Sequence, residues 1–497
     1  VQTSGANPRP GLVATFCSFP VMCLFLLAGA IFAYCGRGIA ESDIWWHMRN
    51  ARALLQYHSL SRTDTYSFTA FGSPWINFEW LSELPFFLAF KAMGLRGLLL
   101  VYFTVLVLIY AVVYYRCCRA GADCKDAVIA TLGAICLGGV SMAPRTLLFG
   151  WLCMVGLLLV IDRFQNTGKG LWLLPPLFAL WINLHGSWVF GIIVLLLVTV
   201  SGLIEGQCGL VTAHRWSSVA LRKLLLAFVT CLAALFINPY GYKLVTYPFK
   251  LLSRPQGVVQ YIDEWQPVDF SNWNGRLALI LIFGLLAVSL FSTRRWRLDQ
   301  VLLAAFALSV ALLHVRFLFF AGLIIAPILA PNLRLFSPYE RELDKPFLNA
   351  GIMAAVIASM ILLFPSNTEL EQSIDAAYPR GALEFMQRHS INGRLFNQYA
   401  WGGYIEWNAP MLKTFIDGRA DIFLYNNTFI DFLRAMALNN SLEIMDKYKI
   451  DYILIPPDEP LSYLLKHGDG WQPIYSDNIA VLFQRRSAAS GATEASK

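Results

Sequence analysis

Long apolar blocks separated by short polar segments fill the first three quarters of the chain. The first block, GLVATFCSFPVMCLFLLAGAIFAY, covers residues 11–34. It is long enough to cross a bilayer as a helix, which takes about 20 apolar residues. The whole pattern predicts about eleven membrane-spanning helices. They cover residues 11–34, 97–115, 125–141, 146–162, 171–184, 187–205, 223–239, 277–292, 299–313, 316–332 and 347–364.

The positions of Lys and Arg between these blocks predict an orientation. Membrane proteins gather Lys and Arg in the loops on the cytoplasmic side. If the N-terminus is cytoplasmic, every basic loop falls inside, and the short outer turns hold little beyond Arg145 and Arg316. The long loops at 35–96 and 240–276, and the tail from about residue 365, then lie outside the cytoplasm. The segment NFEWLSELPFFLAFKAMG at 77–94 is apolar but short, and we expect it to lie at the outer membrane face.

The tail differs in pattern from the rest of the chain. Its apolar runs are short and separated by polar turns, as in KTFIDGRADIF, DYILIPPDEP and NIAVLFQRR, which read as strands. The stretch LYNNTFIDFLRAMALNNSLEIMDKYK reads as a pair of helices. We therefore expect a transmembrane domain at 1–364, a small extracytoplasmic α/β domain at 365–487 and a disordered tail at 488–497.

Composition supports a membrane protein. The chain is 57% hydrophobic and 14% charged, whereas a soluble domain has about 25% charged residues. The net charge of +7 comes from basic residues in short inner loops. It reports topology, and we expect no nucleic-acid partner.

The stretch ESDIWWHMRN at 41–50 places an acid, a histidine and two tryptophans just beyond the first block. Residues 43–58 fit a helix, with Ser42 as its cap and Asp43 in its first turn, where the helix dipole favours a negative charge. Indole rings concentrate at the membrane–water interface. One interpretation is therefore an amphipathic anchor helix on the outer leaflet, and the other is part of an active site.

Two outer arginines are candidates for phosphate binding. Arg145 in MAPRTLLFG and Arg316 in LLHVRFLFF stand at span ends beside apolar runs. A charge within the membrane costs about 3 kcal/mol, so each either extends to the lipid headgroups or serves a ligand. The planar guanidinium group matches phosphate oxygens.

Four further outer residues are candidate substrate contacts. His185 in WINLHGSW lies at a turn between two spans, and His47 follows the two tryptophans. Asp263 and Glu264 in YIDEWQPVDF belong to the long outer loop and offer a second acid, as acceptor contacts or metal ligands. The alternatives are a hydrogen-bonded turn histidine, an interfacial histidine and a solvated loop, respectively.

The outer segments resemble those of a known superfamily. ESDIWWHMRNARALLQ, SRTDTYSF and SPWINFEWLSELPFFLAFKAMG, within 41–96, resemble the first outer loop of GT-C membrane glycosyltransferases, especially bacterial relatives of protein O-mannosyltransferases and lipid A aminoarabinose transferases. The tail phrases NQYAWGGYIEWNAP and TFIDGRADIF resemble the outer domain of bacterial proteins of this type. The resemblance implies a polytopic helical fold and a polyprenyl-phosphate-linked sugar donor.

By position, Asp43 matches the first-loop acid of that superfamily, which serves as catalytic base or positions the acceptor. Glu79 and Trp80 match the second helix of the loop only loosely. Many members carry another acid in the second outer loop, where this chain has SMAPRT with Arg145. This departure removes support for a metal site, and we expect no required cofactor.

The resulting hypothesis is an inverting glycosyltransferase in a bacterial inner membrane, with its C-terminal domain in the periplasm. It passes a sugar from a polyprenyl-phosphate donor to an unidentified acceptor on the outer face, with Asp43 as base. The alternative is a non-catalytic subunit, or a lipid or polysaccharide transporter, built on the same scaffold. Transporters tend to place ionisable residues near the middle of the membrane, whereas this chain keeps them at span ends.

Overall fold

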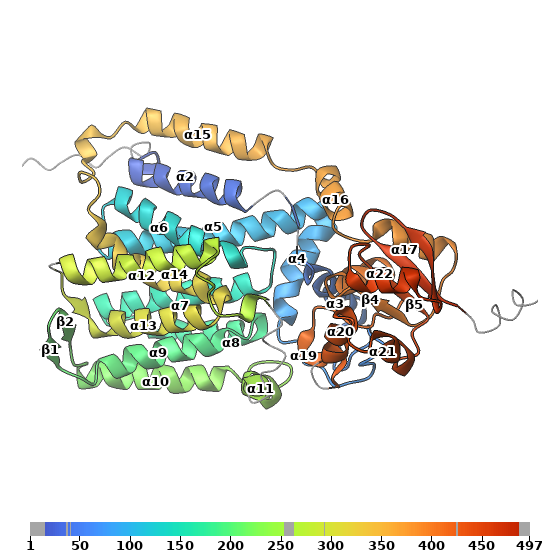
Figure 1. The fold of residues 1–497 in the computed structure, drawn as a ribbon. Coiled ribbons are helices and arrows are strands. Elements are labelled where there is room, and N and C mark those ends of the chain that lie inside the picture. Colours follow the sequence, from blue (N-terminus) through green and yellow to red (C-terminus); the bar gives the residue numbers. More distant parts are fainter. Residues whose placement is uncertain are drawn as a thin grey trace, which may run out of the picture.

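The structure is a computed structural model that describes residues 15–35, 38–39, 41–252, 263–292, 294–423 and 426–486, except for the side chains of Leu252 and Asp263. Long helices run side by side as a bundle, and a smaller domain built from the C-terminal quarter covers one end of it (Figure 1). The bundle is made of α2 (Phe19–Tyr34), α5 (Leu95–Arg119), α6 (Cys124–Gly138), α7 (Leu147–Thr167), α8 (Leu174–Leu184), α9 (Trp188–Ser201), α10 (Ser218–Ala234), α12 (Trp273–Phe291), α13 (Leu298–Leu313), α14 (Leu318–Leu333) and α15 (Pro346–Leu362).

Each of the eleven predicted segments overlaps one of these helices, but the count of eleven membrane spans is not confirmed. Among the described residues, five helical segments are long and apolar enough to cross a membrane, or six if the bent pair of α15 and α16 (Asn367–Asp375) is one span. Those five cover Leu95–Arg119, Cys124–Ser141, Leu147–Thr167, Trp273–Phe291 and Val315–Leu333. Several of the others are apolar but shorter, with Phe19–Tyr34 and Leu298–Leu313 among them.

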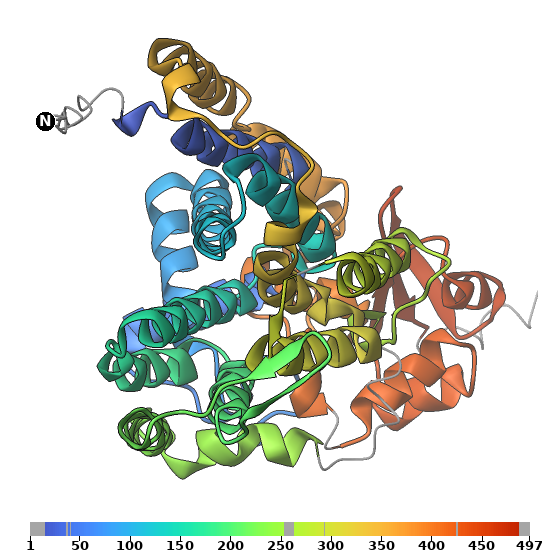
Figure 2. The ribbon, with the colours of Figure 1, turned by 90° about the vertical axis from the view of Figure 1, so that its left-hand side faces the viewer.

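The two ends of the bundle are built differently. Near one end, α4 (Trp80–Met93) runs across the direction of the bundle helices, next to the C-terminal domain (Figure 1). Its 14 residues span only about 21 Å at 1.5 Å per residue, less than the roughly 30 Å of a bilayer core. Figure 2 faces the opposite end, which carries a small sheet of β1 (Gly206–Cys208), β2 (Val211–Ala213) and β3 (Trp296–Arg297).

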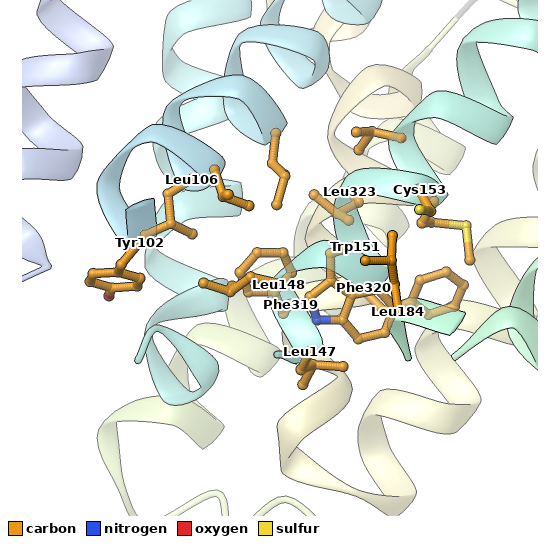
Figure 3. Packing of buried hydrophobic residues seen from close by; sticks show 14 of the residues in the cluster. Tyr102, Leu106, Leu147, Leu148, Trp151, Cys153, Leu184, Phe319, Phe320 and Leu323 are labelled. Carbon is orange, nitrogen blue, oxygen red and sulfur yellow. The ribbon is translucent and has the colours of Figure 1, made fainter. Parts of the chain in front are cut away.

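Close packing of aromatic and small residues fixes the bundle interior. Trp151 of α7 is fully buried and stacks on Phe319 and Phe320 of α14, at ring centroid distances of 5.9 and 5.7 Å (Figure 3). In α14, a Cβ added at Gly322 would stand 3.1 Å from the carbonyl oxygen of Ala134 in α6. Small residues let membrane helices approach closely, so α14 holds α6 and α7 together and fixes where their outer ends lie.

The C-terminal domain is the predicted α/β unit. Its sheet has the order β4-β5-β7-β6, with β4 parallel to β5 and the remaining neighbours antiparallel. The strands are β4 (Leu395–Asn397), β5 (Tyr452–Ile455), β6 (Trp471–Ser476) and β7 (Val481–Arg485). Its helices are α17 (Arg380–Arg388), α18 (Gly402–Asn408), α19 (Ala420–Phe423), α20 (Thr428–Met436), α21 (Ser441–Lys447) and α22 (Pro460–His467).

The strands predicted in DYILIPPDEP and NIAVLFQRR are confirmed as β5 and β7, and the predicted helical pair as α20 and α21. The strand predicted in KTFIDGRADIF is wrong. Thr414 makes only isolated bridges to Ser67 and Leu395, and the chain then turns into α19. This segment is irregular because it follows the surface of the first outer loop instead of joining the sheet. The predicted disordered tail at 488–497 lies outside the described residues.

Candidate active site

The candidate site is built around Asp43 at the start of α3 (Ile44–Tyr57). The predicted helix at 43–58 is confirmed, but the predicted cap at Ser42 is wrong. Asp43 itself is the N-cap residue, and its side chain makes no capping hydrogen bond. Instead, its Oδ1 accepts a hydrogen bond of 3.2 Å from the indole Nε1–H of Trp46, one turn along the helix. This bond holds one oxygen of the carboxylate against the first turn of the helix.

The prediction that α3 lies on the outer leaflet as an amphipathic anchor is also wrong. Seven consecutive or near-consecutive residues of α3, including both tryptophans, are buried in the protein. Trp45 packs edge-on against Tyr404 and Tyr378 of the C-terminal domain, with ring centroids 5.1 and 5.8 Å apart. The helix is therefore a packed layer between bundle and C-terminal domain, because both of its faces find protein partners.

A chain of alternating acids and histidines runs from α3 into the bundle. The Nδ1 of His47 lies 3.0 Å from Oε1 of Glu83 in α4, and its Nε2 lies 3.6 Å from Oε2 of Glu79. The other oxygen of Glu79 lies 3.1 Å from Nε2 of His185, at the end of α8. His185 Nδ1 accepts the backbone N–H of Ser187 at 2.9 Å, so the proton of this imidazole is on Nε2 and is donated to Glu79.

Burial and hydrogen bonding set the protonation of this chain. Burial opposes ionisation of Glu79, yet the hydrogen bond from His185 holds its pKa below the ordinary value. Burial raises the pKa of Glu83. Burial also opposes a charge on His47, but its bond to Glu83 and the nearby Glu79 carboxylate raise its pKa overall. His47, buried between two acids near Asp43, therefore keeps its proton more readily than an ordinary histidine.

Arg145, in the turn before α7, is the centre of a second ionic group. Its Nε donates to Glu41 and its Nη1 donates to Glu264, so one guanidinium group joins the first outer loop to the loop before α12. Glu41 is 2% exposed, and its Oε1 also accepts the backbone N–H of Asp43 at 3.3 Å. Arg145 is thus paired with two acids, which gives this arginine a structural role at the site.

Arg316 has fewer partners than Arg145. It lies in the short helix Val315–Phe317 at the start of α14, with its guanidinium carbon 4.7 Å from the ring centre of Trp265. Its nearest acid among the described residues is Glu264, whose Oε2 is 3.9 Å from Nη1. The Nε of Arg316 is buried without a hydrogen-bond partner in the described part of the chain. An unsatisfied buried donor is costly, so this group suits an anionic ligand.

The environment of Asp43 raises its basicity. Burial, and next the charge of Glu41, raise the pKa of the Asp43 carboxyl to about 7, although Arg145 and His47 act in the opposite direction. A carboxylate with a pKa near neutrality is a stronger base than an ordinary aspartate and is about half ionised at neutral pH. This shift suits proton abstraction.

The C-terminal domain contributes the wall of the site. A Cβ added at Gly418 would stand 1.8 Å from Oδ1 of Asp43, so any side chain there would have to displace this carboxylate. The next residue, Arg419, is 2% exposed and binds Asp417 at 2.6 Å and Asp64 of the first outer loop at 2.8 Å. Arg419 thus pairs with Asp417 of its own domain and with Asp64, and the second contact ties the domain to the first outer loop.

Most of the sequence-predicted site residues meet in this region. His47, Glu79 and His185 form one connected group, and Arg145, Glu264 and Arg316 form the other. Asp43 lies one turn from His47 on α3, and its backbone N–H donates to Glu41, the partner of Arg145. The side chain of Asp263 lies outside the described residues. Among the described residues, no three His, Cys, Asp or Glu side chains are placed to hold a metal ion.

Sequence reasoning missed three contributors: Glu41, Glu83 and Gly418. Glu41 stands two residues before Asp43 in the same quoted stretch, so its position was a usable signal. Glu83 lies inside the apolar segment at 77–94, where no neighbouring residue in the sequence indicates its partner. Gly418 comes from a segment 375 positions away from Asp43 in the printed sequence, and only the tertiary structure brings the two together.

Three cavities are lined by described residues at other places, and Asp43, Arg145 and Arg316 line none of the three.

No family model matches the chain, and no curated protein matches it. Among solved structures, the apo form of the oligosaccharyltransferase from Archaeoglobus fulgidus is similar to it, at 13% identity and a TM-score of 0.54. The match covers 87% of this chain and 69% of the oligosaccharyltransferase chain. The chain therefore shares the fold of this oligosaccharyltransferase. At this identity the likeness concerns the fold alone, and the chemistry has to be argued from the residues above.

Replacing Arg419 by Met should strongly destabilise the protein, because Arg419 joins the C-terminal domain to the first outer loop. It leaves the buried carboxylates of Asp64 and Asp417 without a cation, and breaking one side of a buried ion pair costs about 3–5 kcal/mol. The measurement is thermal unfolding of the purified protein in detergent. The control is Arg388→Met, since Arg388 is an exposed partner of Glu384 and such pairs contribute about 0.5 kcal/mol. Equal melting temperatures for the two variants would contradict the assigned role.

Proposed function

We propose that this protein is a membrane glycosyltransferase that moves a sugar from a polyprenyl-phosphate carrier to an acceptor hydroxyl outside the cytoplasm. The observation that carries the proposal is the neighbourhood of Asp43, where a basic carboxylate and an unsatisfied arginine share one end of a GT-C bundle. The similar solved structure is an oligosaccharyltransferase by its printed title, which supports the same reaction class. The long apolar helices supply the setting for a lipid-linked donor.

The proposed step is a single displacement at the anomeric carbon. Asp43 accepts the proton of the acceptor hydroxyl while the hydroxyl oxygen attacks that carbon. The bond between the carbon and the phosphate oxygen breaks, and the electron pair leaves with the polyprenyl phosphate. The carbon inverts its configuration. Because phosphate is already a good leaving group, the site needs charge stabilisation there and has no use for the second acid of a glycosidase.

Arg316 is the proposed phosphate-binding residue. Its guanidinium group faces one distant carboxylate oxygen and an indole ring, whereas Arg145 is held by two acids. A group that keeps an unused donor can bind a phosphate oxygen without first breaking an ion pair. Arg145 then acts by fixing Glu41 and Glu264, which keeps Asp43 and Arg316 on the same side of the site.

The histidines and Glu79 have a supporting role in this proposal. His47 lies one turn from Asp43 on the same helix and adds positive charge near the carboxylate. Its bonds to Glu79 and Glu83 anchor α3 against α4, while His185 extends the contact to α8. We propose that these residues keep Asp43 in place and that those nearest the site contact the sugar.

Replacing Asp43 by Asn should abolish sugar transfer with little effect on folding. The amide cannot accept the acceptor proton, and a general base contributes roughly a hundred- to ten-thousandfold in rate. The measurement is transfer of radiolabelled sugar from polyprenyl phosphate by the purified protein. Donor binding by the same variant serves as the control and should persist. Undiminished turnover would instead favour a non-catalytic subunit or a transporter on this scaffold.

Replacing Arg316 by Ala should raise the KM for the lipid-linked donor about tenfold, since a charged hydrogen bond contributes about 1.5–3 kcal/mol. Arg276→Ala is a matched control, because Arg276 is an exposed arginine in the first turn of α12 that donates to the backbone of Ser271. Titration of the donor at saturating acceptor separates KM from kcat. An unchanged donor KM would leave Arg316 without the proposed role.

The pH profile tests the basicity of Asp43. The base must be ionised, so the rate should fall about tenfold per pH unit below the pKa of about 7. The Glu41→Gln variant loses a negative charge that raises the pKa of Asp43. It also releases Arg145 from one acid, and the charge of Arg145 lowers that pKa. Both effects should move the acidic limb of the profile to a pH lower by about one unit. A limb that stays in place in this variant would show that another group titrates.

A further inference from the structure

A separate cavity of about 640 Å³ opens at the end of the bundle opposite to the C-terminal domain, the end that faces the viewer in Figure 2. Its walls come from the C-terminal ends of α5, α7 and α14 and from the turn that joins α12 to α13. None of these residues belongs to the candidate active site. The proposed transfer reaction makes no use of this cavity.

The charge of the cavity is strongly positive and only partly compensated. Six arginines and two aspartates line it. The aspartates are already paired within the protein: Asp162 binds Arg116 at 2.7 Å, and Asp299 binds Arg297 at 2.6 Å. Four arginines remain without a carboxylate partner among the described residues, namely Arg119, Arg163, Arg294 and Arg295.

These four arginines come from three separate elements. Arg119 ends α5, Arg163 lies in the last turns of α7, and Arg294 and Arg295 lie in the turn after α12. Arg295 donates to Gln207 of β1 at 2.9 Å, which fixes this turn against the small sheet. Like charges brought together from distant segments repel one another unless an anion lies between them. Their convergence on one cavity therefore indicates an anionic ligand.

The deeper wall of the same cavity is apolar. Leu158 of α7, Leu303 of α13 and Ile324, Pro327 and Ile328 of α14 line it. A free phosphate ion would use only the arginines and leave this wall in contact with water. A molecule with a phosphate group and hydrocarbon chains matches both parts, and basic pockets between membrane helices bind the headgroups of anionic lipids.

We propose that this cavity binds an anionic phospholipid of the leaflet opposite to the C-terminal domain. The phosphodiester pairs with the four free arginines, and an acyl chain lies along the apolar wall of α14. Lipid binding here would hold the ends of α5, α7 and α14 together.

The test compares two charge-matched triple variants of the full chain by native mass spectrometry in neutral detergent, with phosphatidylglycerol as the probe. One variant is Arg163→Gln, Arg294→Gln and Arg295→Gln. The control is Arg215→Gln, Arg222→Gln and Lys223→Gln, which removes the same charge from exposed residues between β2 and α10 and within α10, outside the cavity. Each basic side chain near an anionic headgroup strengthens binding roughly fivefold.

The cavity variant should weaken phosphatidylglycerol binding at least about tenfold, with less than about a twofold change in the control. Phosphatidylcholine binding should be weak in all three proteins. Equal losses in both variants would overturn the proposal, since general surface charge would then explain binding. Competition by soluble glycerophosphoglycerol as strong as that by the lipid would also overturn it, because the apolar wall would contribute nothing. Arg163→Gln alone, expected to weaken binding about fivefold, repeats the test with less disturbance of the fold.

Discussion

The contact between Gly418 and the carboxylate of Asp43 is the constraint on which the rest of the site depends. It requires the C-terminal domain to lie against the start of α3, with no side chain between them. The adjacent Arg419 secures this position through Asp417 and Asp64. Bundle, first outer loop and C-terminal domain therefore act as one body at this end. The burial that raises the pKa of Asp43 follows from the same contact.

Pairing of buried charges is the second principle of the site. Taking a charge out of water is costly unless a partner of opposite sign compensates it. Glu79 lies between two histidines, and Arg145 lies between two acids, so each of these charges is balanced. Arg316 departs from this rule, because its one acidic neighbour among the described side chains is at the limit of an ion pair. The departure occurs beside Asp43, where a phosphate would supply the missing charge.

Sequence reasoning went furthest where hydrophobic periodicity is strong. A helix occupies each of the eleven predicted segments, and the α/β character of the tail was also predictable, because both depend on local patterns. The spanning count was less accessible, since several of these helices are shorter than a bilayer requires. Asp43, His47, Arg145 and Arg316 were found as candidates because polar residues are rare in such a chain. Glu83, Gly418 and Asp64 were not, because only tertiary contacts bring them to the site. The two tryptophans misled for the same reason: an indole suits a membrane interface and a protein core equally well.

The most direct test of this account is sugar transfer from a polyprenyl-phosphate donor by the Gly418→Ala variant, compared with Gly470→Ala. Gly470 lies in the same domain, and an added Cβ there meets nothing within 4 Å. If the Gly418 contact positions the base, the added methyl group displaces Asp43, and the rate should fall roughly a hundredfold. Gly470→Ala should keep the parental rate. Full activity of Gly418→Ala would contradict the account, because Asp43 would then be free to move without loss of function.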